Sequence, residues 1–149
     1  MERDRFGSLL TLKTPSGQWL HLENDSAHRV HKISSSLGRT VQYGYDATGR
    51  LTSVTDSDGH ADTYSYDEKA EMIAVSHGKD APILKNSYFI DGYIKEQTLA
   101  DGRKFQYWYS HGPRNVIDQT LILHPSGLST FVQYGSHGYA ESLPTATPK

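Results

Sequence analysis

The sequence contains no cysteine among its 149 residues. This absence excludes disulfide bonds, thiol catalysis and any zinc site with thiolate ligands. Long apolar runs are also missing, so no segment has the length and composition of a membrane-spanning helix. The first ten residues, MERDRFGSLL, lack the apolar stretch of a signal peptide, and we expect no targeting signal on this chain.

Neither sign of charge dominates, because the chain has 15 Lys and Arg and 17 Asp and Glu, which gives a net charge of −2. The chain therefore has no general attraction for nucleic acid or anionic lipid, and we expect no nucleic-acid partner and no membrane insertion. Hydrophobic residues make up 36% and the mean hydropathy is −0.62, which is polar for a compact globule. Much of the burial must come from the rings of 10 tyrosines.

One phrase occurs twice at an offset of 21 residues. YGYDATGRLTSV (43–54) and YSYDEKAEMIAV (64–75) both begin Tyr-x-Tyr-Asp and end in Val. Glycines at similar spacing anchor further copies: Gly17, Gly38, Gly59, Gly102 and Gly127, with a weaker copy around Gly92. The repeat predicts a lead-in at 1–8, about six copies of roughly 21 residues at 9–140, and a Pro/Thr-rich tail at 141–149. The 25 residues from Gly102 to Gly127 predict an insertion near SHGPRN.

The copies have the composition of β-hairpins. Glycine ends the four-residue turns TPSG, SSLG, DATG, DSDG, FIDG, LADG, HPSG and GSHG, where a hairpin loop needs a positive φ. Runs rich in Tyr, Val, Thr and Leu lie between them, as expected for strands. DEKAEMIAV has helix-forming residues, but its place in the repeat favours a strand. Leu51 and Val54 break strict alternation, which predicts a bulge or twist at Ser53. A compact β-sandwich is the alternative, and the 21-residue spacing disfavours it.

Tyr-x-Tyr-Asp-x-x-Gly-Arg-Leu-x-x-Val, as it stands from Tyr43 to Val54, resembles the YD repeat of Rhs proteins, a family that includes toxin-complex shell proteins and teneurins. The resemblance is strongest at 38–58, good at 59–79 and degenerate elsewhere. It implies an all-β fold of antiparallel hairpin repeats in a curved, twisted sheet or strip, a piece of an Rhs-type β-shell. The residues that carry the motif, with an expected structural role, are Tyr43, Tyr45, Asp46, Gly49, Arg50, Leu51, Val54, Tyr64, Tyr66, Asp67, Tyr107 and Tyr109.

In that family the repeats spiral into a hollow shell that often encloses a toxin. The resemblance therefore implies a non-catalytic encapsulation module of a bacterial, toxin-associated protein, whose parent is secreted or lies at the cell surface. The chain departs from the family in one respect. The self-cleaving Asp-Pro-x-Gly elements have no counterpart, since the nearest string is HPSGLS, from His124 to Ser129. Six repeats are also too few to close a large shell.

Catalytic and metal-binding patterns are absent or better explained by turns. His28 and His31 are three apart, which on a strand places them on opposite faces and does not favour a shared metal. Asp46 and Asp67 could form a carboxylate pair for glycoside hydrolysis, but their positions at the start of turns explain them. No serine elbow, phosphate loop or nucleotide motif is present. We expect no enzyme activity, no cofactor and no metal.

Exposed aromatic residues support a second hypothesis, a carbohydrate- or protein-binding module. Trp108 is expected on the strand face opposite Tyr107 and Tyr109, where it either forms a platform for a glycan or protein or packs inside the sheet. Trp19 is the other candidate for ligand binding, or a cap on the end of the sheet. The stem of Arg50 is expected to cover a tyrosine ring. Unpaired strand edges predict self-association, or pairing with neighbouring repeats of a longer parent.

Overall fold

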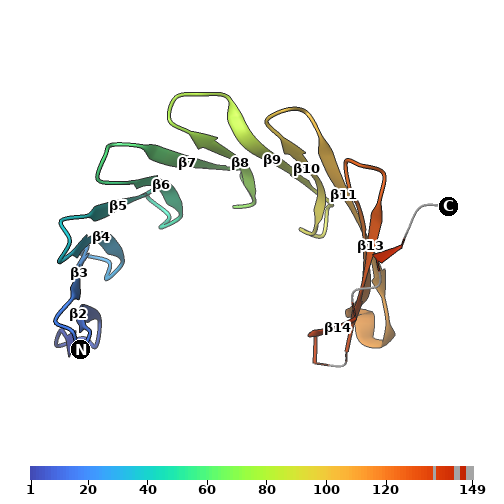
Figure 1. Ribbon diagram of the computed structural model, residues 1–149. Coiled ribbons are helices and arrows are strands. Elements are labelled where there is room, and N and C mark those ends of the chain that lie inside the picture. Colours follow the sequence, from blue (N-terminus) through green and yellow to red (C-terminus); the bar gives the residue numbers. More distant parts are fainter. Residues whose placement is uncertain (136, 143–144, 147–149) are drawn as a thin grey trace. The chain divides into compact units, whose positions relative to one another are not determined.

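The computed structural model describes residues 1–135, 137–142 and 145–146. The chain divides into two units, each described by itself. The first comprises Met1–Ser65 with Val75–Asp80, and the second comprises Tyr66–Ala74 with the chain from Ala81 onward. Nearly every element is a β-strand (Figure 1). Within the described ranges, no helix is long and apolar enough to cross a membrane.

The first unit is a run of antiparallel strands that pair in chain order. The strands are β1 (Glu2–Arg3), β2 (Leu9–Lys13), β3 (Trp19–Asn24), β4 (Val30–Ser35), β5 (Thr40–Tyr45), β6 (Leu51–Thr55) and β7 (Ala61–Tyr66). Tyr66, the last residue of β7, belongs to the second unit. β8 (Met72–His77) is shared between the units: its residues up to Ala74 belong to the second unit, and those from Val75 belong to the first.

The second unit has the same construction. It contains β9 (Pro82–Tyr88), β10 (Ile94–Leu99), β11 (Lys104–His111), the 3-10 helix η1 (Pro113–Asn115), β12 (Ile117–Leu123), β13 (Ser129–Tyr134), β14 (Ala140–Ser142) and β15 (Thr145–Ala146). β14 and β15 both pair with β13. The all-β fold of antiparallel hairpins expected from the sequence is confirmed, and so is the strand in DEKAEMIAV. The 3-10 helix lies where the sequence predicted an insertion.

The turns explain how short segments of polar sequence form hairpins. The eight glycines that end the predicted turns all have φ between 76° and 88°. In each of these turns the glycine N–H donates to the carbonyl three residues earlier, as in Gly49 to Asp46 (3.0 Å). Three further turns place another residue in the left-handed position, which the sequence reading missed: His28, Ala70 and Asn115. The left-handed residue thus recurs through the chain whether or not it is glycine.

Two expectations need correction. The bulge predicted at Ser53 lies one residue earlier: Ser53 pairs with Gly44 and Leu51 pairs with Tyr45, so Thr52 is the extra residue. The Ser53 hydroxyl lies against Gly44, in the space that a Cβ at that position would fill. His28 does not lie on a strand opposite His31, because it takes the left-handed turn position and its ring contacts the Phe6 ring at 4.7 Å.

Little of the chain is fully buried. Among the described residues, Val132 is the buried hydrophobic side chain, and Thr11 and Thr120 are the buried polar ones. Contacts within each unit join strands that are neighbours in the sheet. Such a sheet is stabilised by strand-to-strand hydrogen bonds and half-buried rings, and the described residues enclose no hydrophobic core in either unit.

Candidate functional site

The Asp of the repeated phrase holds its own turn. Asp46 Oδ1 accepts hydrogen bonds from the backbone N–H groups of Thr48 and Arg50 (both 2.9 Å), and its Oδ2 accepts one from Arg50 Nε (2.6 Å). These bonds, first that of the Arg50 backbone and then that of its side chain, keep the pKa of the Asp46 carboxyl well below its usual range. A carboxylate so occupied is a poor general acid, which favours a structural role.

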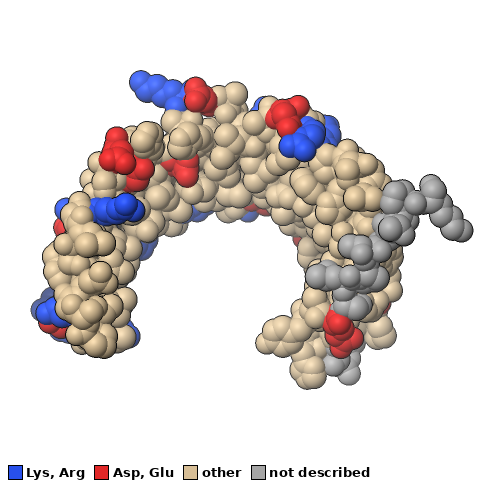
Figure 2. Space-filling model, in the orientation of Figure 1, with Lys and Arg blue, Asp and Glu red and all other residues tan. Residues whose placement is uncertain are grey.

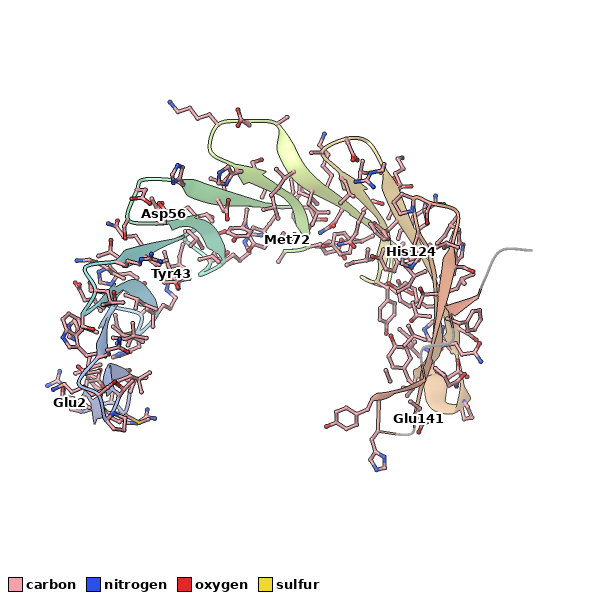
Figure 3. The ribbon with its side chains drawn as sticks, in the orientation of Figure 1. Glu2, Tyr43, Asp56, Met72, His124 and Glu141 are labelled. Carbon is pink, nitrogen blue, oxygen red and sulfur yellow. The ribbon has the colours of Figure 1, made fainter. Side chains whose placement is uncertain are left out.

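Equivalent aspartates make the same contacts in other turns. Asp25 accepts from the Arg29 backbone and side chain, and Asp67 accepts from the N–H groups of Lys69 and Glu71. Asp56 lies in such a turn, and its place can be compared in Figure 3 with that of Tyr43, which lies on strand β5. Asp56 also lies close to Asp58 and His60, with ligand atoms within 4.8 Å of one another. All three are exposed.

The second tyrosine of the phrase links one hairpin to the one before it. The hydroxyl of Tyr45 donates to the Val30 carbonyl (2.7 Å), and Arg29 stacks on the Tyr45 ring at 4.5 Å. The arginine–tyrosine contact expected for Arg50 is thus made by its counterpart one repeat earlier, and for Arg50 it stays a prediction. Such a contact covers the ring while the guanidinium remains near water.

The same bridge recurs in the second unit. Tyr88 donates to the Met72 carbonyl (2.7 Å) and Tyr109 donates to the Ile94 carbonyl (2.9 Å). Each acceptor stands two residues after a left-handed turn residue, as Val30 does after His28. Burial raises the pKa of Tyr109 to about 12, so its hydroxyl remains a donor throughout the physiological range.

The remaining motif positions lie on strands and are half-buried: Tyr43 on β5, Leu51 and Val54 on β6, Tyr64 and Tyr66 on β7, and Tyr107 on β11. Tyr107 donates to the Gln97 side-chain carbonyl, Gln97 donates to Asn86 (3.2 Å), and Asn86 donates to the Met72 carbonyl (2.9 Å). A polar chain thus crosses this face of the second unit, and it contributes to pairing between strands.

The two tryptophans lie in different units and have different surroundings. Trp19 is 38% exposed and stands opposite Lys13, beside a hollow of about 520 Å³ lined by Glu2, Thr11, Lys13, His21 and Ser34. It does not cap the sheet, because β1 and β2 lie outside β3.

Trp108 is 46% exposed and pairs with Leu121, which pairs in turn with Phe131, itself 40% exposed. Its strand neighbours are therefore apolar, whereas Trp19 borders both the polar hollow and a second one that contains Leu12, Leu20 and Leu37. Tyr107 and Tyr109 alternate with Trp108 along β11, as the sequence predicted.

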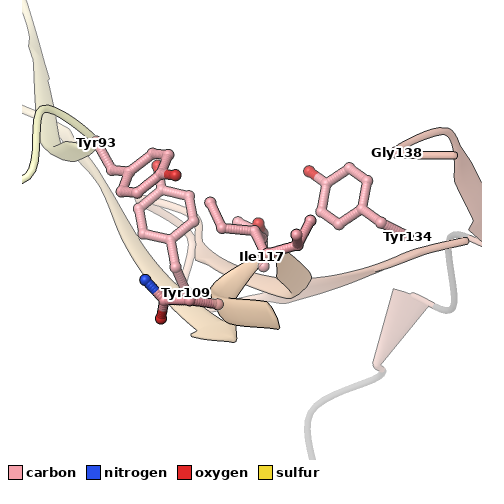
Figure 4. Close-up of a pocket in the computed structure, with 8 residues that line it drawn as sticks. Tyr93, Tyr109, Ile117, Tyr134 and Gly138 are labelled. Carbon is pink, nitrogen blue, oxygen red and sulfur yellow. The ribbon is translucent and has the colours of Figure 1, made fainter. Parts of the chain in front are cut away.

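Sequence reasoning missed a hollow lined by tyrosines in the second unit. It has a volume of about 430 Å³, and Tyr93 and Tyr109 form one side while Tyr134 stands across from them (Figure 4). The rings of Tyr93 and Tyr109 lie 5.1 Å apart. The remaining lining residues are Asn115, Val116, Ile117, Thr120 and Gly138. The signal in the sequence was the long spacing before Gly127, which gave no indication of a cavity.

Charged side chains do not form a single patch on the face seen in Figure 2. Basic and acidic groups are scattered along it, with neither sign continuous. Several of them pair, including Lys32 with Glu23 (3.0 Å) and Lys104 with Glu96 (2.8 Å). This face offers no broad electrostatic surface for a polyanion.

Comparison with known proteins bears on the family and on the fold. The family model for the Rhs repeat matches residues 25–61 and 45–75, so the resemblance found in the sequence is confirmed. No curated protein matches the chain.

Solved structures of toxin complexes match over most of the chain. A mutant of the Photorhabdus luminescens Tc holotoxin pore is 18% identical over 86% of this chain, with a TM-score of 0.60. The TcdB2–TccC3 crystal structure and its form without the hypervariable C-terminal region are each 17% identical over 85%, with TM-scores of 0.61 and 0.62. The chain spans only 7% to 8% of the length of these proteins, and at this identity the likeness establishes the fold.

Proposed function

We propose that this chain, which carries Rhs repeats over residues 25–75, is a non-catalytic wall segment of a shell that encloses a secreted toxin or forms part of a surface protein. The family model and the toxin-complex structures together support a structural module of the Rhs type. The observation that carries the proposal is the construction of each unit: strands contact their neighbours in the sheet and enclose almost no core. A sheet in which each strand contacts only its neighbours can be extended by further repeats at its edges.

The partners follow from the same construction. β1 and β14 are the outer strands, and no strand of the described ranges pairs with their free edges. Unpaired N–H and C=O groups on such edges bind other strands. We infer that the edges pair with neighbouring repeats of a longer parent, or with a second copy of the chain. Secretion or display at the cell surface belongs to that parent.

Grafting tests the wall function. Residues 9–140 replace the segment of the TcdB2–TccC3 shell that they match, and a polypeptide fused behind the shell serves as cargo. If the segment is a wall, the chimaera assembles and its cargo resists added protease as it does in the parent shell. The matched control carries Gly38→Val and Gly59→Val, which force a β-branched residue into a positive φ. An assembled chimaera whose cargo is digested as fast as free polypeptide contradicts the proposal.

A second candidate function is binding of carbohydrate or protein through the exposed tryptophans. The exposure of Trp19 and Trp108 favours it, the latter on a strand whose phenylalanine and tyrosines are half-buried. Aromatic faces of this kind stack on sugars and anchor protein interfaces. Titration of a glycan panel with tryptophan fluorescence tests it: quenching that disappears in Trp19→Ala or Trp108→Ala supports the function, and a flat signal across the panel removes it.

A further inference from the structure

The tyrosine hollow lies where the bridge between hairpins is interrupted. In three earlier hairpins, a tyrosine hydroxyl donates to the carbonyl two residues after the left-handed turn residue. The next such carbonyl is that of Ile117, two residues after Asn115, and the corresponding tyrosine is Tyr134, which pairs with Ala140 as Tyr88 pairs with Ile94. Within the described residues, the Tyr134 hydroxyl has no hydrogen-bond partner.

The cause of the interruption is the insertion. Ile117 and Tyr134 are 17 residues apart, against 15 or 16 for the three bonded pairs, and they line the hollow together without bonding each other. The hydroxyl of Tyr93, on the other side, likewise has no partner in the part of the chain that the structure describes. Two phenol groups that can donate and accept therefore stand on opposite sides of one cavity (Figure 4).

Thr120 supplies an independent observation. It lies on β12 between Tyr109 and Val132 and is only 4% exposed. Its Oγ1 is buried and makes no hydrogen bond, although it belongs to a residue that lines the hollow. Buried hydroxyl groups nearly always have a partner, so this unpaired one lowers the stability of the strand beside the hollow.

The lining narrows the class of ligand. Its described residues are three tyrosines, two aliphatic residues, a threonine, an asparagine and a glycine, none of them charged. Aromatic faces suit the C–H faces of a sugar ring, and hydroxyl and amide groups suit its hydroxyls. A volume of about 430 Å³ falls within the range of small-ligand sites, roughly 300–1,000 Å³.

From this geometry we propose that the Tyr93–Tyr109–Tyr134 hollow binds a neutral saccharide, with sugar hydroxyls bonded to the phenol groups of Tyr93 and Tyr134. The inference deepens the second candidate function but moves the ligand to the tyrosine face, away from Trp19 and Trp108, and it does not depend on the wall function. Asn115 at the rim provides an amide that can bond a further hydroxyl.

Calorimetric titration with maltotriose, cellotriose and N-acetylchitotriose tests the proposal on the full chain. We expect one of these neutral trisaccharides to bind with a stoichiometry of one. Tyr134→Ala should weaken that binding about 10-fold or more, because it removes one aromatic wall. Tyr134→Phe should weaken it by about 3- to 10-fold while the chain stays folded, because it removes a single hydrogen bond and keeps the ring.

The matched control is Tyr139→Ala, which removes a 78% exposed tyrosine next to Gly138 that does not line the hollow, and it should leave binding unchanged. Binding lost in the double variant Trp19→Ala, Trp108→Ala but kept in Tyr134→Ala assigns the sugar to the tryptophans and overturns the inference. Absence of binding for all three sugars also overturns the inference. So does a result in which a proline-rich peptide binds the chain and none of the three sugars does. The graft experiment is independent of each of these outcomes.

Discussion

Replacement of Thr120 by valine should stabilise the second unit, which is unusual for a polar residue in a β-strand. The side chain is 4% exposed and its hydroxyl has no partner. An unsatisfied buried hydroxyl costs about 1–3 kcal/mol, and valine has the same shape without that group. We therefore expect Thr120→Val to raise the free energy of unfolding by about 1 kcal/mol or more in the absence of ligand, and the melting temperature by about 2–4 °C per kcal/mol.

The measurement needs a probe in each unit, and the two tryptophans provide it. Trp19 lies in the first unit and Trp108 in the second, so urea unfolding of Thr120→Val in a Trp19→Phe background reports on the second unit through Trp108. Thr11→Val is the matched control in a Trp108→Phe background. Thr11 is also buried, at 8% exposed, but its hydroxyl lies 3.4 Å from His21 Nδ1.

Opposite signs are expected for the two variants. Loss of the Thr11 bond should cost about 0.5–1.5 kcal/mol in the first unit, while Thr120→Val should stabilise the second. If both substitutions destabilise by similar amounts, the Thr120 hydroxyl has a partner in solution, and the stabilisation expected from its removal is refuted.

Three further predictions concern turns and pH. Asp46→Asn should lower the melting temperature at neutral pH. Because the folded-state pKa of this carboxyl is lowered, the contribution is present above its unfolded pKa and is lost as pH falls through the folded value, so melting curves of variant and parent should converge in acid. His77 behaves in the opposite sense: its hydrogen bond to Asp62 (2.8 Å) raises its pKa, so the pair stabilises below the unfolded pKa of His and that stability is lost as pH rises through the folded pKa. Melting temperatures of Asp62→Asn between pH 5 and 8 should therefore lack that slope, and a slope equal to the parent's contradicts the assignment. Ala70→Gly should stabilise by about 1 kcal/mol, since Ala70 has a φ of 67°, and a urea midpoint below that of the parent would rule out the strain inferred there.

The hairpins could be predicted because their determinants are local. A glycine three residues after the first turn position fixes a positive φ, and an Asp at that first position, as in DATG, bonds the two N–H groups that follow it. Both signals are written within five residues, so the sequence suffices to read them. His28 and Ala70 were missed because they adopt the left-handed region without glycine, and only the repeat spacing could have revealed them.

Side-chain faces were predictable, but environments were not. Alternation along β11 places Trp108 opposite Tyr107 and Tyr109, and the structure agrees. The neighbours of Trp108 depend on the register between strands 10 or more residues apart, which pairs it with Leu121 and brings Phe131 alongside. A one-residue slip would exchange those neighbours for the other face, so no pattern within a single strand specifies them.

The hollow shows the same limit most clearly. The sequence contains Tyr134 at its repeat position, and the extra residues before Gly127 are visible in the spacing. What it does not state is where the added length is absorbed. The bonded pairs Val30–Tyr45, Met72–Tyr88 and Ile94–Tyr109 are 15 or 16 residues apart, whereas Ile117 and Tyr134 are 17 apart. The added length is thus divided between the 3-10 helix before Ile117 and the stretch from Ile117 to Tyr134, and these two residues line a hollow in place of the regular bridge.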